Sequence, residues 1–219
     1  MPFVSFEGID GSGKTTQVEN LCRWLFERGE RVVRTKEPDG GRLGPRVRAL
    51  LTAPENAGSL SPIEELLLIS AARYDHVRSV IAPALEEGAW VVSDRFVDSS
   101  AALQAFETEV GESLFESVST AVTGGVLPDL TLILDLDPVE AAERRSKRAV
   151  PERDDPAEKR RDFERIRRGF VRVAERSPAR CRLLDASVSE EDLAKAVRQA
   201  VVEMDLPRKQ SPSFPGRGI

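Results

Sequence analysis

A glycine-rich stretch near the amino terminus has the residue types and the spacing needed to bind a phosphate group. FEGIDGSGKTTQ covers residues 6–17, and Gly8, Gly13, Lys14 and Thr15 fit the pattern G-x-x-x-x-G-K-[ST]. Backbone N–H groups can surround phosphate oxygens only where side chains stay away and some residues take positive φ. A helix beginning near Gly13 adds the positive end of its dipole, and Lys14 can reach β- and γ-phosphates. The predicted nucleotide-binding residues of this loop are Gly8, Ile9, Asp10, Gly11, Ser12, Gly13, Lys14, Thr15 and Thr16.

A magnesium ion is expected beside this loop, because the Thr15 hydroxyl can ligate it and a carboxylate at a strand end can complete the site. WVVSD ends at Asp94, and LILDLD offers Asp135 and Asp137 as alternatives. Asp94 is preferred since Arg95 follows it directly, which sets a guanidinium fork for phosphate beside a metal ligand. Taken alone, the Asp-Arg pair is more typical of a simple ion pair at the end of a strand.

Alternating strands and helices would position these groups. The expected strands are residues 3–8, 31–37, 89–94, 128–137 and 181–186. The expected helices are residues 14–29, 43–51, 61–88, 138–148, 162–176 and 189–204, with further helix up to about residue 122. Pro83 should kink or end the third of these, whereas Ser61 and Glu64 should form a capping box at its start. The pattern predicts an α/β fold with a five-stranded parallel sheet flanked by helices.

Composition excludes several classes of function. The chain has 219 residues and a net charge of −5, which does not favour nucleic-acid or membrane binding. No apolar run is long enough to span a bilayer, and no signal segment precedes the first strand. The two cysteines, Cys22 and Cys181, match no metal-binding spacing and are expected to be reduced thiols. We therefore expect a cytoplasmic protein.

Five segments in this order resemble thymidylate kinase, a member of the nucleoside monophosphate kinase group of P-loop proteins. They are FEGIDGSGKTTQ, KEPDGG, AARYDHV, IAPALEEGAWVVSDRFVDSSAALQ and PDLTLILDLDP, and the resemblance extends from Phe3 to about Asp185. It implies a P-loop kinase fold with a lid at about 145–158. The resemblance also implies ATP as donor, dTMP as acceptor, Mg²⁺ as cofactor and a homodimer. The pattern of strands and helices shows no repeat and no second core, which predicts one domain over residues 1–205, and three prolines predict a disordered tail at 206–219.

The same resemblance implies roles for individual residues on the acceptor side. Asp10 would bind the deoxyribose 3′-hydroxyl, Arg73 would read the thymine edge, and Arg95 would hold the acceptor phosphate and bridge toward the donor. Lys36 stands before EP, where the family usually has an arginine near the acceptor phosphate. The other residues that it places around the acceptor are Arg48, Ile69, Ser99, Ser100, Leu103 and Gln104.

The lid RRSKRAVPERDDPAEKRR would supply further positive charge to a transfer that depends on positioning and charge stabilisation. Arg144 matches the arginine that packs on adenine. Arg148 is the candidate for the phosphates, and it joins Lys14 and Arg95 in the predicted catalytic set. Gly11 occupies a position where one subgroup carries an arginine, which indicates that the lid provides the catalytic one. Arg145, Lys147 and Arg153 compete with Arg148, and spacing does not separate them.

Three departures from the family pattern bear on the base. Ile69 stands where a phenylalanine usually stacks on thymine, Leu103 where a tyrosine is usual, and Pro45 where a glutamate is common. The alternative function is therefore a kinase for another nucleoside monophosphate, or for several. A nucleotide-switched P-loop binding protein is the alternative from another class, but a GTPase should carry an N-K-x-D motif and the chain has none.

Overall fold

The computed structural model describes residues 1–56, 59–147 and 161–204. The lid proposed at 145–158 is thus described only up to Lys147, and the tail at 206–219 lies outside the described residues. Among the residues described, no helix has the length and apolar character needed to cross a membrane.

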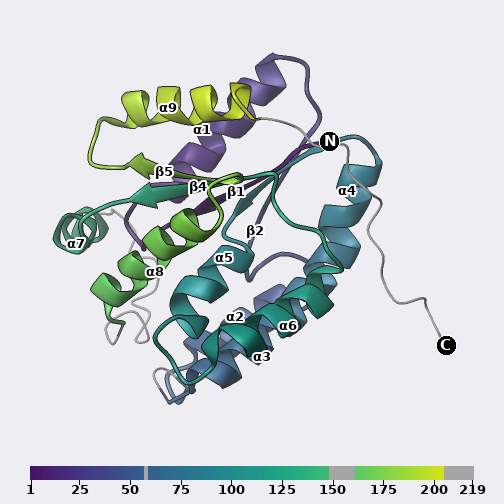
Figure 1. Ribbon diagram of the computed structural model, residues 1–219. Coiled ribbons are helices and arrows are strands. Elements are labelled where there is room, and N and C mark those ends of the chain that lie inside the picture. The colour runs from purple at the N-terminus through teal and green to yellow at the C-terminus, as the bar shows by residue number, and fades with distance from the viewer. Residues whose placement is uncertain (57–58, 148–160, 205–219) are drawn as a thin grey trace.

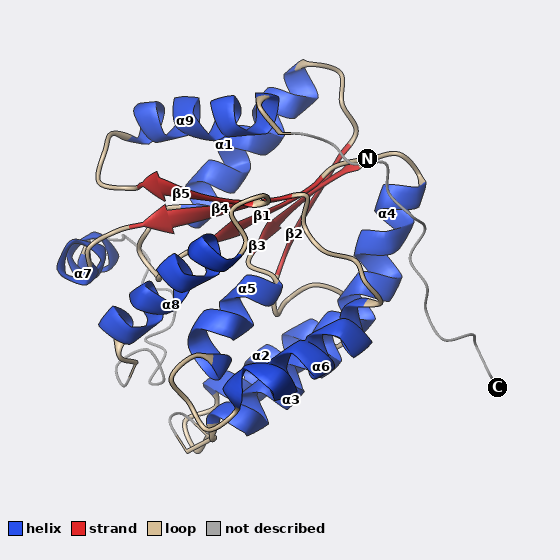
Figure 2. Ribbon diagram, viewed as in Figure 1, coloured by secondary structure: helices blue, strands red, loops and turns tan. Residues whose placement is uncertain are grey.

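A parallel sheet of five strands forms the centre of the molecule, as predicted (Figure 2). Its strands are β1 (Phe3–Glu7), β2 (Val32–Lys36), β3 (Trp90–Asp94), β4 (Leu130–Asp135) and β5 (Cys181–Asp185). They lie in the order β2-β3-β1-β4-β5, and every pairing is parallel. Phe6 is in register with Asp94, so β1 and β3 reach the same edge of the sheet together. This edge, at the carboxyl ends of the central strands, receives the glycine-rich loop.

Helices cover both faces of the sheet (Figure 1). On one face α1 (Lys14–Glu27) packs beside α9 (Glu190–Val202), and on the other lie α5 (Val97–Ser100) and α8 (Phe163–Arg176). The remaining elements are α2 (Gly44–Thr52), α3 (Pro62–His76), the π-helical η1 (Val77–Ile81), α4 (Ala82–Glu86), the π-helical η2 (Ala101–Ala105), α6 (Gly111–Thr123) and α7 (Pro138–Ser146). The largest core cluster joins buried residues of β1 and β4 to α1, α8 and α9. Two-sided burial explains why β4 is almost wholly apolar.

The long helix expected over residues 61–88 is present but changes its winding. It begins at Ser61, which caps α3 and forms the predicted capping box with Glu64. From Val77 to Ile81 the chain widens into a π-helical turn before α4 carries Pro83 in its first turn. Proline has no N–H and its ring clashes with the carbonyl four residues earlier in an α-helix, so a wider turn accommodates it. The helix is interrupted just before Pro83 and does not end there.

Candidate active site

The glycine-rich loop connects β1 to α1 with a backbone that needs its glycines. Gly8, Gly11 and Gly13 have φ values of 133°, 96° and 92°. A Cβ atom added to Gly8 would lie 2.5 Å from the carbonyl oxygen of Leu134, so any side chain there would force the loop off β4. The buried Ser12 hydroxyl has no hydrogen-bond partner among the described residues. Backbone N–H groups at the start of α1, with the Ser12 hydroxyl beside them, fit a phosphate.

Lys14 lies inside the loop and not in solvent. Its side chain is buried, and Nζ donates to the carbonyl oxygens of Gly8 at 3.0 Å and Ile9 at 2.9 Å. Burial and the positive charge of Arg95 lower the pKa of Lys14, which the nearby Asp10 carboxylate opposes. An ammonium group held this way is preorganised for an anion that enters the loop.

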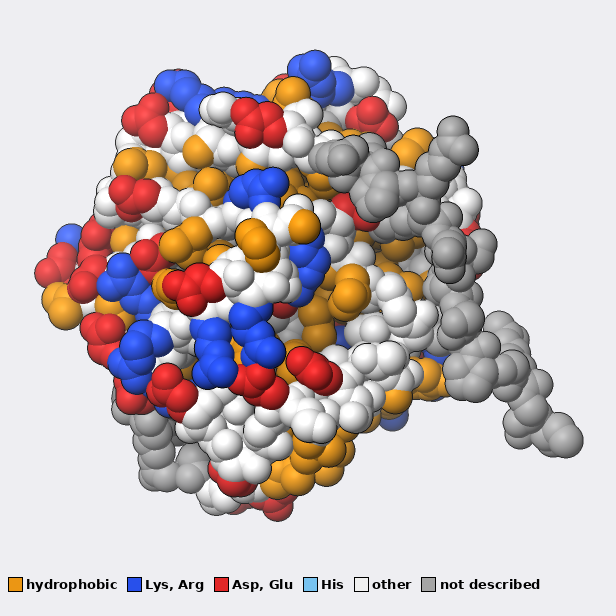
Figure 3. Space-filling model, in the orientation of Figure 1, with side chains coloured by type: hydrophobic (Ala, Val, Ile, Leu, Met, Phe, Trp, Pro, Cys, Tyr) orange, Lys and Arg blue, Asp and Glu red, His pale blue; other side chains and the backbone are white. Residues whose placement is uncertain are grey.

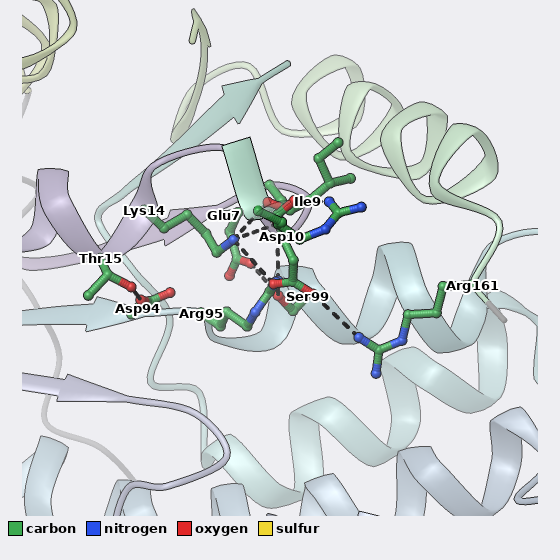
Figure 4. A network of polar contacts seen from close by, with 11 residues as sticks. Glu7, Ile9, Asp10, Lys14, Thr15, Asp94, Arg95, Ser99 and Arg161 are labelled. Carbon is green, nitrogen blue, oxygen red and sulfur yellow. Dashed lines mark hydrogen bonds and ion pairs between the residues drawn. The ribbon is translucent and has the colours of Figure 1, made fainter. Parts of the chain in front are cut away.

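Asp10 is the carboxylate on which the cations of the site converge (Figure 4). Arg95 donates to its Oδ1 at 2.5 Å, while Lys14 lies 3.7 Å from Oδ1 and Arg161 lies 3.5 Å from Oδ2. Burial raises the pKa of Asp10, but the three cations outweigh burial and hold it well below the usual range. Asp10 is therefore a carboxylate at neutral pH, and it offsets part of the positive charge of these three cations.

Thr15 and Asp94 lie side by side, as the magnesium prediction requires. The Thr15 hydroxyl donates to Asp94 Oδ2 at 2.8 Å (Figure 4). The two alternatives are engaged elsewhere, because Asp135 accepts both arms of Arg167, at 2.7 and 2.9 Å, and Asp137 caps α7. One hydroxyl and one carboxylate are hard oxygen donors, the type that Mg²⁺ prefers when phosphates and water complete its shell. No cluster of three or more acidic, His or Cys ligands occurs in the described parts of the chain.

Arg95 has a strained backbone whose hydrogen bonds are all made. Its φ of 72° lies in the left-handed region, which costs a non-glycine residue about 1 kcal/mol or more. Its N–H donates to the Phe6 carbonyl, and its own carbonyl accepts from the Ser93 hydroxyl at 2.7 Å. The guanidinium donates to the Gly8 carbonyl at 3.1 Å and to Ser99 Oγ at 2.9 Å. Strain at a residue fixed from several sides is typical of a functional site.

Arg73 is fully buried and is held by a carboxylate that the sequence did not assign to it. Glu37 Oε2 accepts from its Nε at 2.9 Å, while Nη2 donates to the Phe96 carbonyl and to Ser100 Oγ. His76 supports Glu37 from behind, with Nδ1 3.2 Å from Oε1. Burial raises the pKa of Glu37, but Arg73 and His76 lower it by more, so the pKa lies below its ordinary value. The remaining Nη1 of Arg73 is buried without a partner among the described residues, as expected of a donor awaiting a base.

Lys36 and Arg48 converge on a second acidic residue, Asp39. Lys36 Nζ lies 2.9 Å from Asp39 Oδ2, and Arg48 Nε donates to Oδ1 at 2.6 Å. Burial raises the pKa of Asp39, but hydrogen bonds from both cations lower it. Both cationic side chains are about half exposed, so an incoming anion can reach them.

The other predicted acceptor-side residues occupy the adjoining helices. Gln104 is buried on η2 and donates to Glu65 at 2.9 Å, and Leu103 lines a shallow pocket that Asp10 and Arg95 also line. Ile69 is half-buried on α3, one turn before the base-reading candidate. Ser99 and Ser100 both receive arginine donors, as described above, which places them beside the two guanidinium groups.

Of the two arginines in the last turn of α7, Arg145 contacts the phosphate loop and Arg144 does not. Arg145 donates to the Asp10 carbonyl at 2.5 Å and stacks on Phe163 with its guanidinium 4.5 Å from the ring centroid. Arg144 instead donates to Glu140 one turn earlier in α7, at 2.6 Å.

The phosphate loop itself has no room for a catalytic arginine. A Cβ atom at Gly11 would lie 2.4 Å from the carbonyl oxygen of Ala141, and its φ of 96° disfavours any side chain. This supports a lid origin for the arginine. Arg148 and Arg153, two candidates for that role, lie outside the described residues.

Four residues of the site were not on the predicted list: Glu7, Glu37, Asp39 and Arg161. Glu7 and Glu37 are buried, and each bonds to a predicted arginine or to its partner. A weak signal existed for Glu7, since it is an acidic residue inside an otherwise apolar strand. Glu37 follows a strand and could have been expected to orient Lys36 or a water, but its pairing with Arg73 joins elements 36 residues apart. Asp39 lies close in sequence to both of its partners, Lys36 and Arg48.

The site combines a glycine-rich loop between a strand and a helix, the Thr15–Asp94 pair and cations around Asp10. Together with the five-stranded parallel sheet, this combination defines a P-loop kinase. Such a site can grip a triphosphate and seat a second phosphorylated molecule opposite it. The chain belongs to the thymidylate kinase family, because the thymidylate kinase family model matches residues 6–197.

Individual relatives agree with this assignment. A thymidylate kinase of Pelotomaculum thermopropionicum is 42% identical over 205 residues, covering 91% of this chain and 94% of the relative. One of Gloeobacter violaceus is also 42% identical, over 201 residues, and covers 91% of this chain and 93% of the relative. The crystal structure of thymidylate kinase from Ehrlichia chaffeensis superposes with a TM-score of 0.72 at 33% identity, covering 91% of this chain and 98% of that one.

Proposed function

We propose that the protein transfers the γ-phosphoryl group of ATP to dTMP, forming dTDP and ADP. The observation that carries this proposal is that Lys14 and Arg95, from distant parts of the chain, both lie against the same oxygen of Asp10 in the phosphate loop. Two anionic nucleotides repel each other, so a kinase needs positive charge where they meet. Membership in the thymidylate kinase family names the nucleotides.

On the donor side, residues 8–16 would hold the triphosphate through backbone N–H groups, the Ser12 hydroxyl and Lys14. Thr15 and Asp94 would hold Mg²⁺, which would offset the negative charge of the triphosphate when bound. The structure shows the hydroxyl and the carboxylate within hydrogen-bond distance, which suits a shared ligand. Arg144 and a lid arginine, with Arg148 as candidate, would complete the adenine and phosphate contacts.

On the acceptor side, the dTMP phosphate would replace internal carboxylates as the partner of the cations. Lys36 and Arg48 are already paired with one carboxylate, that of Asp39, so their side chains point at a common anion position. Arg95 would turn part of its fork from Asp10 to the phosphate, which leaves Asp10 free to accept from the sugar 3′-hydroxyl. Arg73, with one unpaired donor, would read the thymine edge beside Ser100.

Chemically, an oxygen of the dTMP phosphate forms a bond to the γ-phosphorus while the bond to the ADP oxygen breaks. No general base is needed, because the attacking phosphate is already anionic. The chain supplies alignment of the two nucleotides and cations around the equatorial oxygens of the transferred group. Lys14, Arg95 and the lid arginine are those cations.

The acceptor is tested with purified protein, ATP, Mg²⁺ and a panel of nucleoside monophosphates, with ADP release followed. We expect kcat/KM for dTMP to exceed that for every other monophosphate by about tenfold or more, since a buried donor without its acceptor is costly. Ile69 in place of an aromatic ring should weaken binding without changing this order. A different monophosphate with higher kcat/KM would reject the base assignment and leave the reaction class intact.

A homodimer is the second part of the proposal, supported by apolar side chains left exposed on α3. Ile63 and Leu67 are 37% and 54% exposed, and residues four apart share one face of a helix. Sedimentation should show a dimer for the native chain and a monomer for Leu67→Asp. Val202→Asp is the matched control, because Val202 is 70% exposed on α9, across the sheet. A native monomer, or a dimer that survives Leu67→Asp, would contradict this assignment.

Nucleotides and a second copy are the only partners that we propose. On the face seen in Figure 3, acidic and basic side chains are interspersed and no continuous basic patch is visible. Nucleic-acid binding proteins rely on such a patch. Cys22 and Cys181 are free thiols, which suits the cytoplasm, where nucleotide substrates also occur.

A further inference from the structure

Glu7 is a buried acidic residue that the mechanism above does not use. It is the last residue of β1, directly before the phosphate loop, and it has no exposed surface. Its Oε1 accepts the Phe96 N–H at 2.7 Å and its Oε2 accepts the Ser99 hydroxyl at 2.5 Å. Burying a carboxylate costs free energy, which its hydrogen bonds and nearby positive charges must offset.

Both donors that Glu7 accepts from, the Phe96 N–H and the Ser99 hydroxyl, adjoin or contact Arg95. The Phe96 N–H belongs to the peptide that follows the left-handed Arg95, so its fixation holds that backbone turn in place. The Ser99 hydroxyl has one proton, and because it is given to Glu7, the oxygen lone pairs face Arg95 Nη1 at 2.9 Å. Glu7 thus sets both the backbone turn and the direction of the guanidinium (Figure 4).

We propose that Glu7 is a positioning residue for phosphoryl transfer, which fixes the Arg95 guanidinium through the Phe96 amide and the Ser99 hydroxyl. This rests on the role proposed above for Arg95. Glu7 touches neither nucleotide in this scheme, so its loss should act on the transfer step and not on ATP binding.

Glu7→Gln keeps the size of the side chain but gives one of the two positions an NH₂ group. If the amide oxygen of the new side chain accepts the Phe96 N–H, its NH₂ group must donate to Ser99 Oγ. The Ser99 hydroxyl proton then has no acceptor at this position. At a pH above the pKa of Glu7, we expect kcat to fall about 10- to 100-fold, as for other residues that orient a catalytic group, with KM for ATP changed less than about twofold. Ser99→Ala should lower kcat too, and the double variant should be no worse than the poorer single one, because one chain of bonds is broken twice.

A pH profile separates positioning from a structural role. Burial and the negative charge of Asp98 raise the pKa of Glu7 to about 8, against the Ser99 hydrogen bond and Arg95. The carboxyl therefore loses its proton as pH rises through about 8, and the ionised form is the one that accepts from both Phe96 and Ser99. At saturating substrates, kcat of the native protein should rise across this window, and Glu7→Gln should lack the rise.

Other charged groups that face Glu7 do not give this slope. These groups are Lys14 on α1, Asp98 on α5 with its partner Arg180, and the Cys181 thiol on β5. The pKa of Cys181 is raised to about 12, so it stays neutral in this window. Proton loss from Lys14 would remove a needed cation and lower kcat, which is the opposite direction.

Asp129→Asn is the matched control, since Asp129 accepts the Phe3 N–H at 2.7 Å at the other end of β1. It should leave kcat and the pH profile unchanged.

A rise near pH 8 that persists in Glu7→Gln, or an unchanged kcat in that variant, would overturn the proposal. If Glu7→Gln does not fold, the profile of Ser99→Ala decides, because the rise should be lost there as well. Should Arg95→Ala retain activity, the proposed function of Arg95 fails; should only Glu7→Gln retain it, this inference alone fails.

Discussion

Replacing Arg95 by alanine is expected to lower kcat by about three orders of magnitude, as for other arginines that stabilise a transferring phosphoryl group. The guanidinium lies between Asp10 and the Gly8 carbonyl, where donor and acceptor phosphates would meet. Burial lowers the pKa of Arg95, but Asp10, Asp94 and Glu7 more than offset this, so the residue is a permanent cation. Initial rates at saturating ATP and dTMP measure the loss.

The fold should tolerate this change. Asp10 keeps Lys14 and Arg161 as cationic neighbours, and alanine meets the same left-handed backbone cost that arginine already does. Arg95→Lys should recover only part of the activity, because an ammonium cannot bridge two groups as a planar fork does. Arg172→Ala is the control for simple loss of an arginine ion pair, since Arg172 pairs with Glu112 far from the loop. A kcat within tenfold of the native value for Arg95→Ala would remove Arg95 from the mechanism.

The parts of the site that sequence could predict are those encoded by neighbouring residues. The loop from Gly8 to Thr16 needs its glycines for a local reason, and Gly8 indeed faces the Leu134 carbonyl too closely for any side chain. Local sequence patterns predict all five strands. The predicted strand 128–137 is longer than β4 (Leu130–Asp135), because Asp137 lies beyond the sheet and caps α7. Asp94 was chosen over Asp135 for a local reason, the adjacent Arg95, and the contact of Asp94 with Thr15 agrees with that choice.

Contacts between distant elements were beyond such reasoning. Nothing local pairs Glu37 with Arg73, because β2 and α3 bring them together only through packing around His76. Asp10 was predicted as a ligand for sugar, yet in the structure it is first the counter-ion of three cations that come from three places in the chain. Its two roles are compatible, since a bound phosphate would release it. The site is thus internally neutralised, and binding exchanges one set of ion pairs for another.

Asp94→Asn is expected to raise the Mg²⁺ concentration needed for half-maximal rate about tenfold or more and to lower kcat about 100-fold. The Thr15 hydroxyl now donates its proton to Asp94, which orients the hydroxyl oxygen and leaves a carboxylate oxygen beside it. An amide keeps the shape but removes the charge, and its NH₂ group repels a cation. Magnesium would then depend on the nucleotide phosphates alone. Titration of MgCl₂ at fixed ATP, with rates and with Mg·ATP-dependent thermal shifts, measures both effects.

Comparing Lys14→Met with Asp94→Asn separates two effects on the rate: the loss of a fixed cation of the protein and weaker binding of the metal. Lys14 bonds to loop carbonyls and not to Asp94, so its replacement should lower the rate by a similar factor at every Mg²⁺ concentration. The thermal shift produced by ATP should also shrink, because the loop loses a cation that would contact the nucleotide. In contrast, Asp94→Asn should recover part of its activity at high Mg²⁺. An unchanged Mg²⁺ requirement in Asp94→Asn would mean that this carboxylate orients Thr15 without serving the metal.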